Sequence, residues 1–133
     1  MKLAFCIDDA RGMLWGGRRQ SRDRVLCARI AEHARACGLP LYVTPYTAKL
    51  FDGEDVCLLN EPQPPRDAFY FAEDGALPLA SADTVYLYHW GRHYPADRFF
   101  EEDLAALGFV LRSSETFAGS SHDAVLEEIY QRA

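Results

Sequence analysis

The chain has 133 residues, with 49% hydrophobic residues, 13% aromatic residues and a formal net charge of −6. This length suffices for one packed domain and is too short for two, and no apolar run approaches the roughly 18 residues that span a bilayer. Because Asp8 and Asp9 follow a very short apolar run, the start of the chain does not resemble a signal peptide. We therefore expect one cytoplasmic domain over residues 1–133 without a membrane partner.

The first half of the chain alternates between strand-like and helix-like segments. Lys2 to Ile7 is an apolar run typical of a buried strand. Apolar residues at gaps of three and four predict a helix over about 22–37, with Ser21 as its N-cap and a glycine and a proline after its end. A second strand follows at Leu41 to Thr44. Residues 2–44 therefore form a β-α-β unit, which pairs its strands in parallel.

The second half contains shorter elements. We expect strands at 56–59, 68–72, 84–90 and 109–112, a helical turn over 45–51, a loop over 61–67, a turn over 73–75, and helices over about 96–107 and 120–131. The segment 56–72 is expected to add an antiparallel hairpin at one edge. Alternating strands and helices predict an α/β three-layer sandwich, with a mostly parallel sheet of about 4–6 strands flanked by helices.

The four cysteines, at positions 6, 27, 37 and 57, have neither C-x-x-C nor zinc-finger spacing. Buried, reduced thiols are the prediction that fits a cytoplasmic chain, with a disulfide or a metal site as the alternatives. We assign no metal ligands, and the cofactor is unknown at this point.

Charge is distributed unevenly along the chain. Residues 1–35 contain eight Lys and Arg against four acids, whereas the remaining residues contain six bases against 16 acids. A local arginine cluster on an acidic protein favours a confined site for a small anion and disfavours a nucleic-acid partner. The alternative is that these arginines pair with acidic residues of the C-terminal part.

The stretch from Asp8 to Asp23 contains the residue types that such a site needs. Asp8 and Asp9 stand where the first strand should end, a position typical of a Mg²⁺ ligand, a general base or an ordinary turn former. We take these two carboxylates as the catalytic candidates. Gly16-Gly17 would let the backbone approach an anion, although the P-loop pattern is absent. The ligand-binding candidates at the helix start, where arginine forks and backbone N–H groups favour anions, are Arg18, Arg19, Gln20 and Ser21.

Other polar segments follow the remaining expected strands. Ligands of open parallel sheets bind beyond the carboxyl ends of the strands, so these segments should meet at one edge. They add four ligand-binding candidates, which are Arg92, Tyr94, Ser121 and His122. Trp90 is expected in the core. No Ser-His-Asp order can be chosen from the candidates, and the G-x-S-x-G and G-x-G-x-x-G patterns are absent.

Five blocks of the sequence carry a resemblance. They are Asp8-Asp9-x-x-Gly12-Met13, Arg18-Arg19-Gln20-Ser21-x-Asp23-x-Val25-Leu26, Thr44 to Lys49, Trp90-Gly91-Arg92-x-Tyr94-Pro95-Ala96-Asp97, and Gly119-Ser120-Ser121-His122. The chain resembles a small uncharacterised bacterial family of about this length, in which Asn often stands at the position of Gly91. Many of its members carry the label ribonuclease Z, which implies an H-x-H-x-D-H zinc motif. That motif is absent here, so we do not adopt the label, and no catalytic role follows from the resemblance.

Two functions are compatible with these observations. The first is binding of a phosphorylated or otherwise anionic small molecule, nucleotides included, at the carboxyl edge of the sheet. Asp8 or Asp9 would then bind metal or act as a base, and Arg18 and Arg19 would hold the anion. The second is a non-catalytic regulatory or protein-interaction module with a structural arginine–carboxylate network. A homodimer is compatible with either, and whether the protein is an enzyme is left open.

Overall fold

The structure is a computed structural model that describes residues 1–59, 65–73 and 79–133. The loop expected over 61–67 and the turn expected over 73–75 lie largely outside the described residues.

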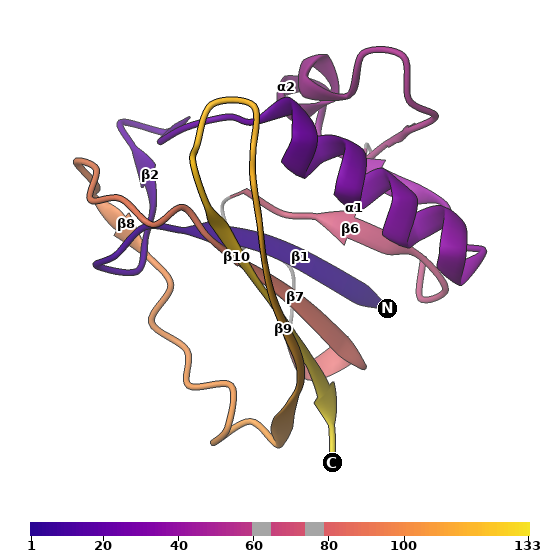
Figure 1. Cartoon of the computed structure of the whole chain (residues 1–133). Coiled ribbons are helices and arrows are strands. Elements are labelled where there is room, and N and C mark those ends of the chain that lie inside the picture. Colours follow the sequence, from indigo (N-terminus) through magenta and orange to yellow (C-terminus); the bar gives the residue numbers. More distant parts are fainter. Residues whose placement is uncertain (60–64, 74–78) are drawn as a thin grey trace.

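A seven-stranded sheet forms the centre of the protein, with strand order β5-β4-β6-β1-β7-β10-β9 (Figure 1). Its strands are β1 Lys2–Ile7, β4 Leu41–Val43, β5 Cys57–Leu58, β6 Phe69–Phe71, β7 Thr84–His89, β9 Phe109–Phe117 and β10 Val125–Arg132. The first five strands in this order, from β5 to β7, run parallel to one another. Strand β10 is antiparallel to both of its neighbours, β7 and β9. The predicted α/β class with a mostly parallel sheet is confirmed.

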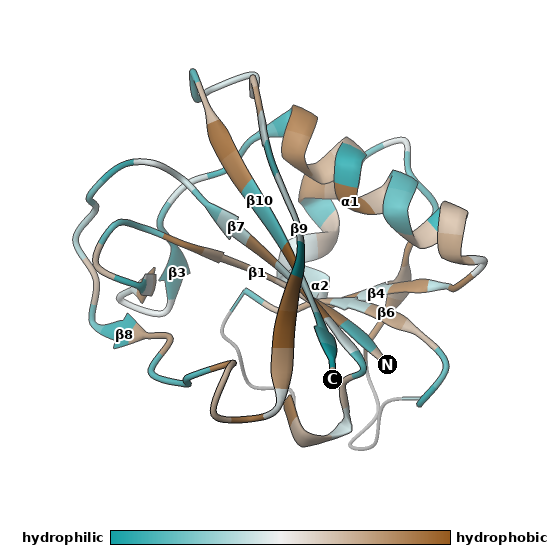
Figure 2. Cartoon of the chain, turned by 60° about the horizontal axis from the view of Figure 1, so that its bottom comes forward, coloured by the Kyte–Doolittle hydropathy of each residue, from teal (hydrophilic) through white to brown (hydrophobic). Residues whose placement is uncertain are grey.

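Helix α1, Arg24–Cys37, lies across one face of this sheet (Figure 1). Its apolar positions, including Leu26, Ile30 and Ala34, are buried in one core cluster with β1, β6 and β7 residues, and Figure 2 shows hydrophobic and hydrophilic residues alternating around the helix. The N-cap is Asp23 rather than the expected Ser21, because the Asp23 side chain accepts the N–H groups of the first turn. The remaining helical segments are α2 Pro45–Ala48, η1 Lys49–Phe51 and η2 Leu79–Ser81.

No helix within the described ranges has the length and apolar character that crossing a membrane requires.

A small antiparallel sheet covers the other face of the main sheet near the end of β1 (Figure 2). It consists of β2 Gly12–Trp15, β3 Arg18–Arg19 and β8 Arg98–Phe99. A second core cluster joins β1 side chains such as Phe5 to Met13, Phe100 and Leu104. Strands and loops, rather than a second layer of helices, therefore close this side in the described part of the chain.

Gly16 and Gly17 form the turn of the β2–β3 hairpin. Their φ angles are +58° and +76°, as a two-residue turn with both central residues in the left-handed region requires. The glycine pair thus reverses the chain, and both flanking strands are short. A Gly-Gly pair between two strands is a known hairpin signal, although the sequence was not interpreted that way above.

Two predicted helices are wrong. Residues 96–107 contain β8 and an irregular segment, in which the Asp103 carboxylate accepts the N–H groups of Ala105 and Ala106. Residues 120–131 are mostly strand β10, with Val125 and Ile129 in the cluster under α1 and Tyr130 against the opposite cluster. A strand that is buried on both faces has apolar residues at irregular spacings, and such spacings also fit a helix. This explains why β10 was predicted to be helical.

The antiparallel hairpin was predicted in the wrong place. The segment 56–72 forms β5 and β6, which both pair in parallel with β4. The antiparallel edge is formed instead by β9 and β10, and β9 extends to Phe117 where a strand over only 109–112 was expected.

All four cysteines are free. Cys6 and Cys27 are buried as expected, whereas the prediction of burial is wrong for Cys37 and Cys57, which are exposed. Burial raises the pKa of the Cys27 thiol to about 12.

Candidate functional site

The carboxyl ends of the central strands meet at one edge with the start of α1. β1 and β7 pair in parallel from Lys2 opposite Thr84 to Ile7 opposite His89, so both strands end at the same side. The antiparallel pairing of β10 with β7 and β9 places the turn between β9 and β10 at this edge as well. The structure thus brings together segments 8–23, 90–95 and 118–122.

Asp8 is buried and its carboxylate is fully engaged. Oδ1 accepts the N–H groups of Ala10 (2.9 Å) and Gly12 (2.7 Å), and Oδ2 accepts those of Tyr94 (3.0 Å) and the Gln20 side chain (3.1 Å). Burial raises the pKa of Asp8, but these hydrogen bonds outweigh burial and lower it below its ordinary value. The ionised carboxylate therefore fixes the loop after β1, and all four of its contacts are internal.

Asp9 and Arg92 lie on the surface, joined through their backbones. The Asp9 N–H donates to the Arg92 carbonyl at 2.9 Å, and both side chains are exposed. Gln20 donates through Nε2 to Asp8 and to the Pro95 carbonyl. Its Oε1 is buried and has no hydrogen-bond partner in the described part of the chain.

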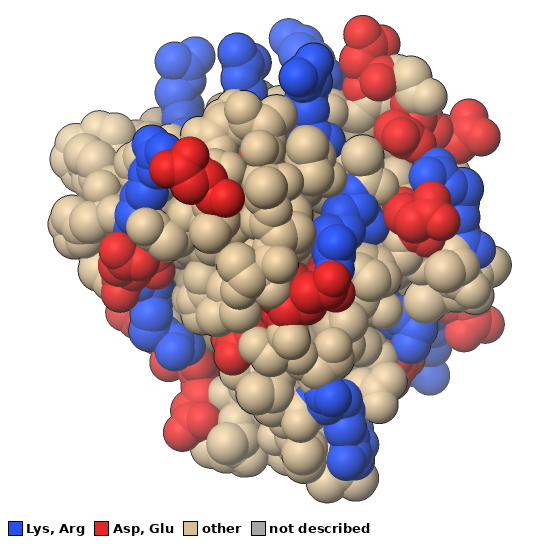
Figure 3. All heavy atoms as spheres, in the orientation of Figure 1, with Lys and Arg blue, Asp and Glu red and all other residues tan. Residues whose placement is uncertain are grey.

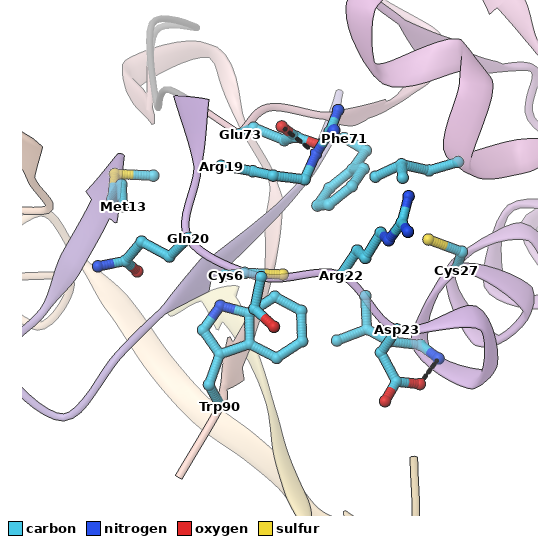
Figure 4. Close-up of a pocket in the computed structure, with 13 residues that line it drawn as sticks. Cys6, Met13, Arg19, Gln20, Arg22, Asp23, Cys27, Phe71, Glu73 and Trp90 are labelled. Carbon is cyan, nitrogen blue, oxygen red and sulfur yellow. Dashed lines mark hydrogen bonds and ion pairs between the residues drawn. The ribbon is translucent and has the colours of Figure 1, made fainter. Parts of the chain in front are cut away.

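Arg19 is paired, whereas Arg18 is not. Arg19 Nε lies 3.0 and 3.1 Å from the two carboxylate oxygens of Glu73, and its guanidinium lies 4.0 Å from the centroid of the Tyr46 ring. Figure 4 shows this pair on one side of a pocket, with Trp90 and Asp23 on the opposite side. Arg18 is exposed on β3 and makes no ion pair with the residues that the structure describes.

Ser21, His122 and Tyr94 are brought together with Asp23. His122 Nδ1 lies 3.0 Å from Asp23 Oδ2, and its Nε2 lies 3.0 Å from Ser21 Oγ and 3.1 Å from the Tyr94 hydroxyl. Trp90 stacks on the imidazole with ring centroids 4.5 Å apart. Three of the predicted ligand-binding residues therefore form one cluster, and Trp90 closes it from the core side.

Asp23 is the centre of this cluster, although the sequence indicated only a role at the helix start. Besides His122, its carboxylate accepts the backbone N–H groups of Ser120 and Ser121 and of Val25 and Leu26 in α1. Burial raises the pKa of Asp23, but the hydrogen bonds, led by the one from His122, hold it well below its ordinary range. The Asp23 carboxylate is therefore ionised at neutral pH, and it ties the β9–β10 turn to α1.

Three neighbouring hollows follow this edge and share lining residues. The central pocket, with a cavity volume of about 20 Å³, is lined by Cys6, Met13, Arg19, Gln20, Ser21, Arg22, Asp23, Leu26, Cys27, Leu50, Phe71, Glu73 and Trp90 (Figure 4). Phe71 and Glu73 also line the aromatic pocket, with a cavity volume of about 190 Å³, which is lined by Tyr42, Tyr46 and Tyr70 as well. Arg22, Asp23, Cys27 and Leu50 also line the basic pocket, together with Arg24, Lys49, Asp52, Ser120 and Ser121.

The basic pocket contains three cationic side chains that the sequence interpretation did not select. Arg22, Arg24 and Lys49 are exposed, and none makes an ion pair with a described residue. Figure 3 shows Lys and Arg side chains projecting along the edge where α1 begins in Figure 1. The signal in the sequence was present, because Arg22 and Arg24 flank the N-cap and Lys49 ends one of the five blocks.

The backbone N–H groups at the start of α1 are already used. Arg24 N donates to Ser120 Oγ, and Val25, Leu26 and Cys27 donate to Asp23. The N–H groups of Arg24, Val25 and Leu26, which have no partner within the helix, are thus satisfied internally, and that of Cys27 makes the first intrahelical hydrogen bond. An anion at this end of α1 would be held by side chains.

Comparisons with known proteins give a likeness of fold. No family model matches the chain, and no curated protein matches it. The chain is similar to the solved structure of dihydrofolate reductase from Enterococcus faecalis complexed with NADP(H) and RAB-propyl, with a TM-score of 0.60 and 12% sequence identity over 99% of this chain and 96% of that chain. At that identity, the likeness shows the fold alone.

Proposed function

We propose that the protein binds a phosphorylated or otherwise anionic small molecule at the carboxyl edge of its sheet, in the basic pocket. The observation that carries this proposal is the group of Arg22, Arg24 and Lys49 around one hollow. None of the three makes an ion pair with a described residue, and they outnumber the two carboxylates of the same hollow, Asp23 and Asp52. Arginine forks match phosphate oxygens in bidentate fashion, and Lys adds a point charge. The positive end of the α1 dipole adds to the same field.

Nucleotides are the anions that the neighbouring pockets favour. The aromatic pocket includes the exposed ring of Tyr46, on whose face opposite Arg19 a planar base can stack, and the central pocket shares residues with both the aromatic and the basic pocket. The structurally similar dihydrofolate reductase holds NADP(H), which is a phosphorylated dinucleotide. These observations support a nucleotide over a small inorganic anion as the physiological ligand.

Arg18 and Arg19 take different places in this proposal than the sequence suggested. Arg19 already has a carboxylate partner in Glu73, so binding an anion would require that ion pair to open. Arg18 lies on β3 and does not line any of the three pockets. We therefore assign the first contacts with the anion to Arg22, Arg24 and Lys49, with Ser121 at the rim of the same pocket.

A structural arginine–carboxylate network is the second candidate, and specific ion pairs favour it. Arg29 binds Glu127 and Glu115, and Lys2 binds Asp83, so basic residues of the N-terminal part do pair with acids of the C-terminal part. A regulatory or interaction module would need no more than this network. It leaves Arg22 and Arg24 unexplained, and for that reason we place it second.

A thermal-shift series distinguishes the two candidates. Inorganic phosphate, adenosine monophosphate and NADPH are compared with chloride at matched ionic strength, because ligands that bind the folded state raise its melting temperature. The proposal predicts a rise with each phosphate compound and a larger rise with the nucleotides. A melting temperature that is the same in phosphate compounds and in chloride would favour the structural network.

A further inference from the structure

An activated serine nucleophile has a serine, a histidine and a carboxylate in contact one after another, and Ser21, His122 and Asp23 are arranged in this way. A serine hydroxyl contacts one nitrogen of an imidazole, and a buried carboxylate contacts the other, at 3.0 Å in both cases. Such an arrangement is identified by geometry and roles, and not by the order of the residues along the chain. From this geometry we infer that Ser21 is a reactive serine, with His122 as its base, and that the site attacks carboxylic esters.

The hydrogen bonds of Asp23 determine which imidazole nitrogen carries the proton. An ionised carboxylate only accepts hydrogen bonds, so Nδ1 of His122 must donate its hydrogen to Oδ2 of Asp23. In the neutral ring, Nε2 then has a lone pair that can accept a hydrogen bond from the Ser21 hydroxyl at 3.0 Å or from the Tyr94 hydroxyl at 3.1 Å. Nε2 is therefore available to take the serine proton, while Asp23 keeps the ring in place.

The burial of His122 and Ser21 suits their proposed roles as base and nucleophile. The imidazole of His122 is 1% exposed and is covered by Trp90, so solvent does not compete for Nε2. Ser21 is half-buried and lines the central pocket, which has room for a water molecule beside its hydroxyl, so an ester requires this pocket to widen. The Tyr94 hydroxyl lies 3.4 Å from Ser21 Oγ and can donate to an oxygen that gains negative charge beside the serine.

The reaction balances with water as the only co-reactant. Ser21 Oγ forms a bond to the ester carbonyl carbon while its proton passes to Nε2 of His122. The alcohol leaves with that proton as its bond to the carbonyl carbon breaks, which gives an acyl-serine. Water then attacks the acyl carbon, gives one proton to Nε2 and releases the carboxylic acid, and the proton returns to Ser21.

Arg22 connects this nucleophile to the basic pocket. It lines both the central and the basic pocket, so an ester with an anionic group could place that group near Arg22 and its carbonyl near Ser21. The preference for an anionic ester rests on the proposed function, whereas the reactivity of Ser21 does not.

A neutral alkyl fluorophosphonate tests the reactive serine without any anion site. Ser21 Oγ would displace fluoride from phosphorus, and mass spectrometry would locate the adduct on the peptide that contains Ser21. We expect no adduct at this position in Ser21→Ala and a rate lowered by about a hundredfold or more in His122→Gln. Ser114→Ala, which removes an exposed hydroxyl on β9, should label like the unchanged protein.

Two results would overturn the inference. One is the absence of an adduct on Ser21 in the folded, unchanged protein. The other is labelling that continues at the same rate when the protein is unfolded in urea, because activation by His122 requires the fold. The urea comparison needs no variant, so it decides the question even if His122→Gln does not fold.

Competition by phosphate separates this inference from the proposed function. Inorganic phosphate should slow the hydrolysis of an anionic ester such as p-nitrophenyl hemisuccinate while fluorophosphonate labelling continues. Labelling without such competition would support Ser21 and contradict the anionic preference.

Discussion

The Nδ1 atom of His122 lies 3.0 Å from Oδ2 of Asp23, across 99 residues of the chain. The same carboxylate caps α1 and accepts the N–H groups of Ser120 and Ser121. One buried side chain therefore joins the start of the long helix to the turn between the last two strands. Both proposed activities depend on this junction, because the basic and central pockets lie on either side of it.

Gly119→Ala should destabilise the protein by about 2 kcal/mol or more, by forcing this junction apart. A Cβ at position 119 would lie 2.8 Å from Cγ of Asp23 and closer still to Oδ2, and moving the buried carboxylate would break hydrogen bonds to His122, Ser120, Ser121 and the first turn of α1. Urea unfolding followed by circular dichroism measures the loss.

A double-variant cycle identifies the cause of that loss. In an Asp23→Ala background the clash partner is gone, so adding Gly119→Ala should cost much less than in the unchanged protein. Equal costs in both backgrounds would mean that the methyl group acts through something other than Asp23.

Acid should destabilise the protein in part through Glu127. Burial raises the pKa of Glu127, but hydrogen bonds from His33, Arg29 and Tyr88 lower it from 4.5 to about 2. A lowered folded-state pKa stabilises the protein above the unfolded pKa, and that stability is lost as pH falls from about 4.5 towards 2. At about 1.4 kcal/mol for each pKa unit, the loss is about 3 kcal/mol.

Urea unfolding between pH 6 and 2 measures this contribution. Glu127→Gln should lower stability at pH 6 and flatten its decline in acid, whereas Glu101→Gln at an exposed position should keep the original slope. An unchanged slope in Glu127→Gln would show that the carboxylate is not stabilised by its neighbours.

Alkylation should separate the four cysteines into two pairs. Cys37 and Cys57 are exposed, whereas burial raises the pKa of both Cys6 and Cys27, which disfavours the reactive thiolate. Iodoacetamide at pH 8 should modify the first pair quickly and the second pair only on unfolding. Peptide mass spectrometry over time gives the four rates, and fast modification of Cys27 in the folded protein would contradict its burial.

Arg19→Ala should destabilise the protein, and Arg18→Ala should not. The Arg19 change removes the Nε–H hydrogen bond shared by the two Glu73 oxygens and the stacking on Tyr46, at a cost of about 1–2 kcal/mol. Arg18 is an exposed neighbour with the same charge, so Arg18→Ala should change the free energy of unfolding by no more than about 0.5 kcal/mol. Thermal unfolding compares the two, and equal effects would mean that the Glu73 contact contributes little.

Much of the parallel half of the fold was predictable from the sequence. β1, β4, β6 and β7 are short apolar runs because both faces of a parallel sheet are covered, and α1 shows the helical period of its buried face. The strand β10 could not be identified in this way. Its buried Glu127 forms an ion pair with Arg29 and a hydrogen bond with His33, both on α1, which the local sequence does not reveal.

The position of the candidate site at one edge of the sheet was predictable from the sequence, whereas most of the contacts within it were not. The rule for parallel sheets brought Ser21, Tyr94 and His122 to one edge, and the structure joins them. The role of Asp23 depends on its contact with His122, which lies 99 residues away in the sequence. Arg19 is already paired with the carboxylate of Glu73. Local patterns cannot show which of several arginines already has a carboxylate partner, so Arg22 and Lys49 were not chosen.

Titration calorimetry with adenosine monophosphate tests the central claim, which is that the cations of the basic pocket bind an anion. The unchanged protein should bind one equivalent, and Arg22→Ala should weaken the affinity about tenfold, or about 1.4 kcal/mol. Arg112→Ala removes the same charge from the exposed edge strand β9 and should leave the affinity unchanged. Absence of binding by the unchanged protein, or equal weakening by Arg22→Ala and Arg112→Ala, would contradict the proposed function.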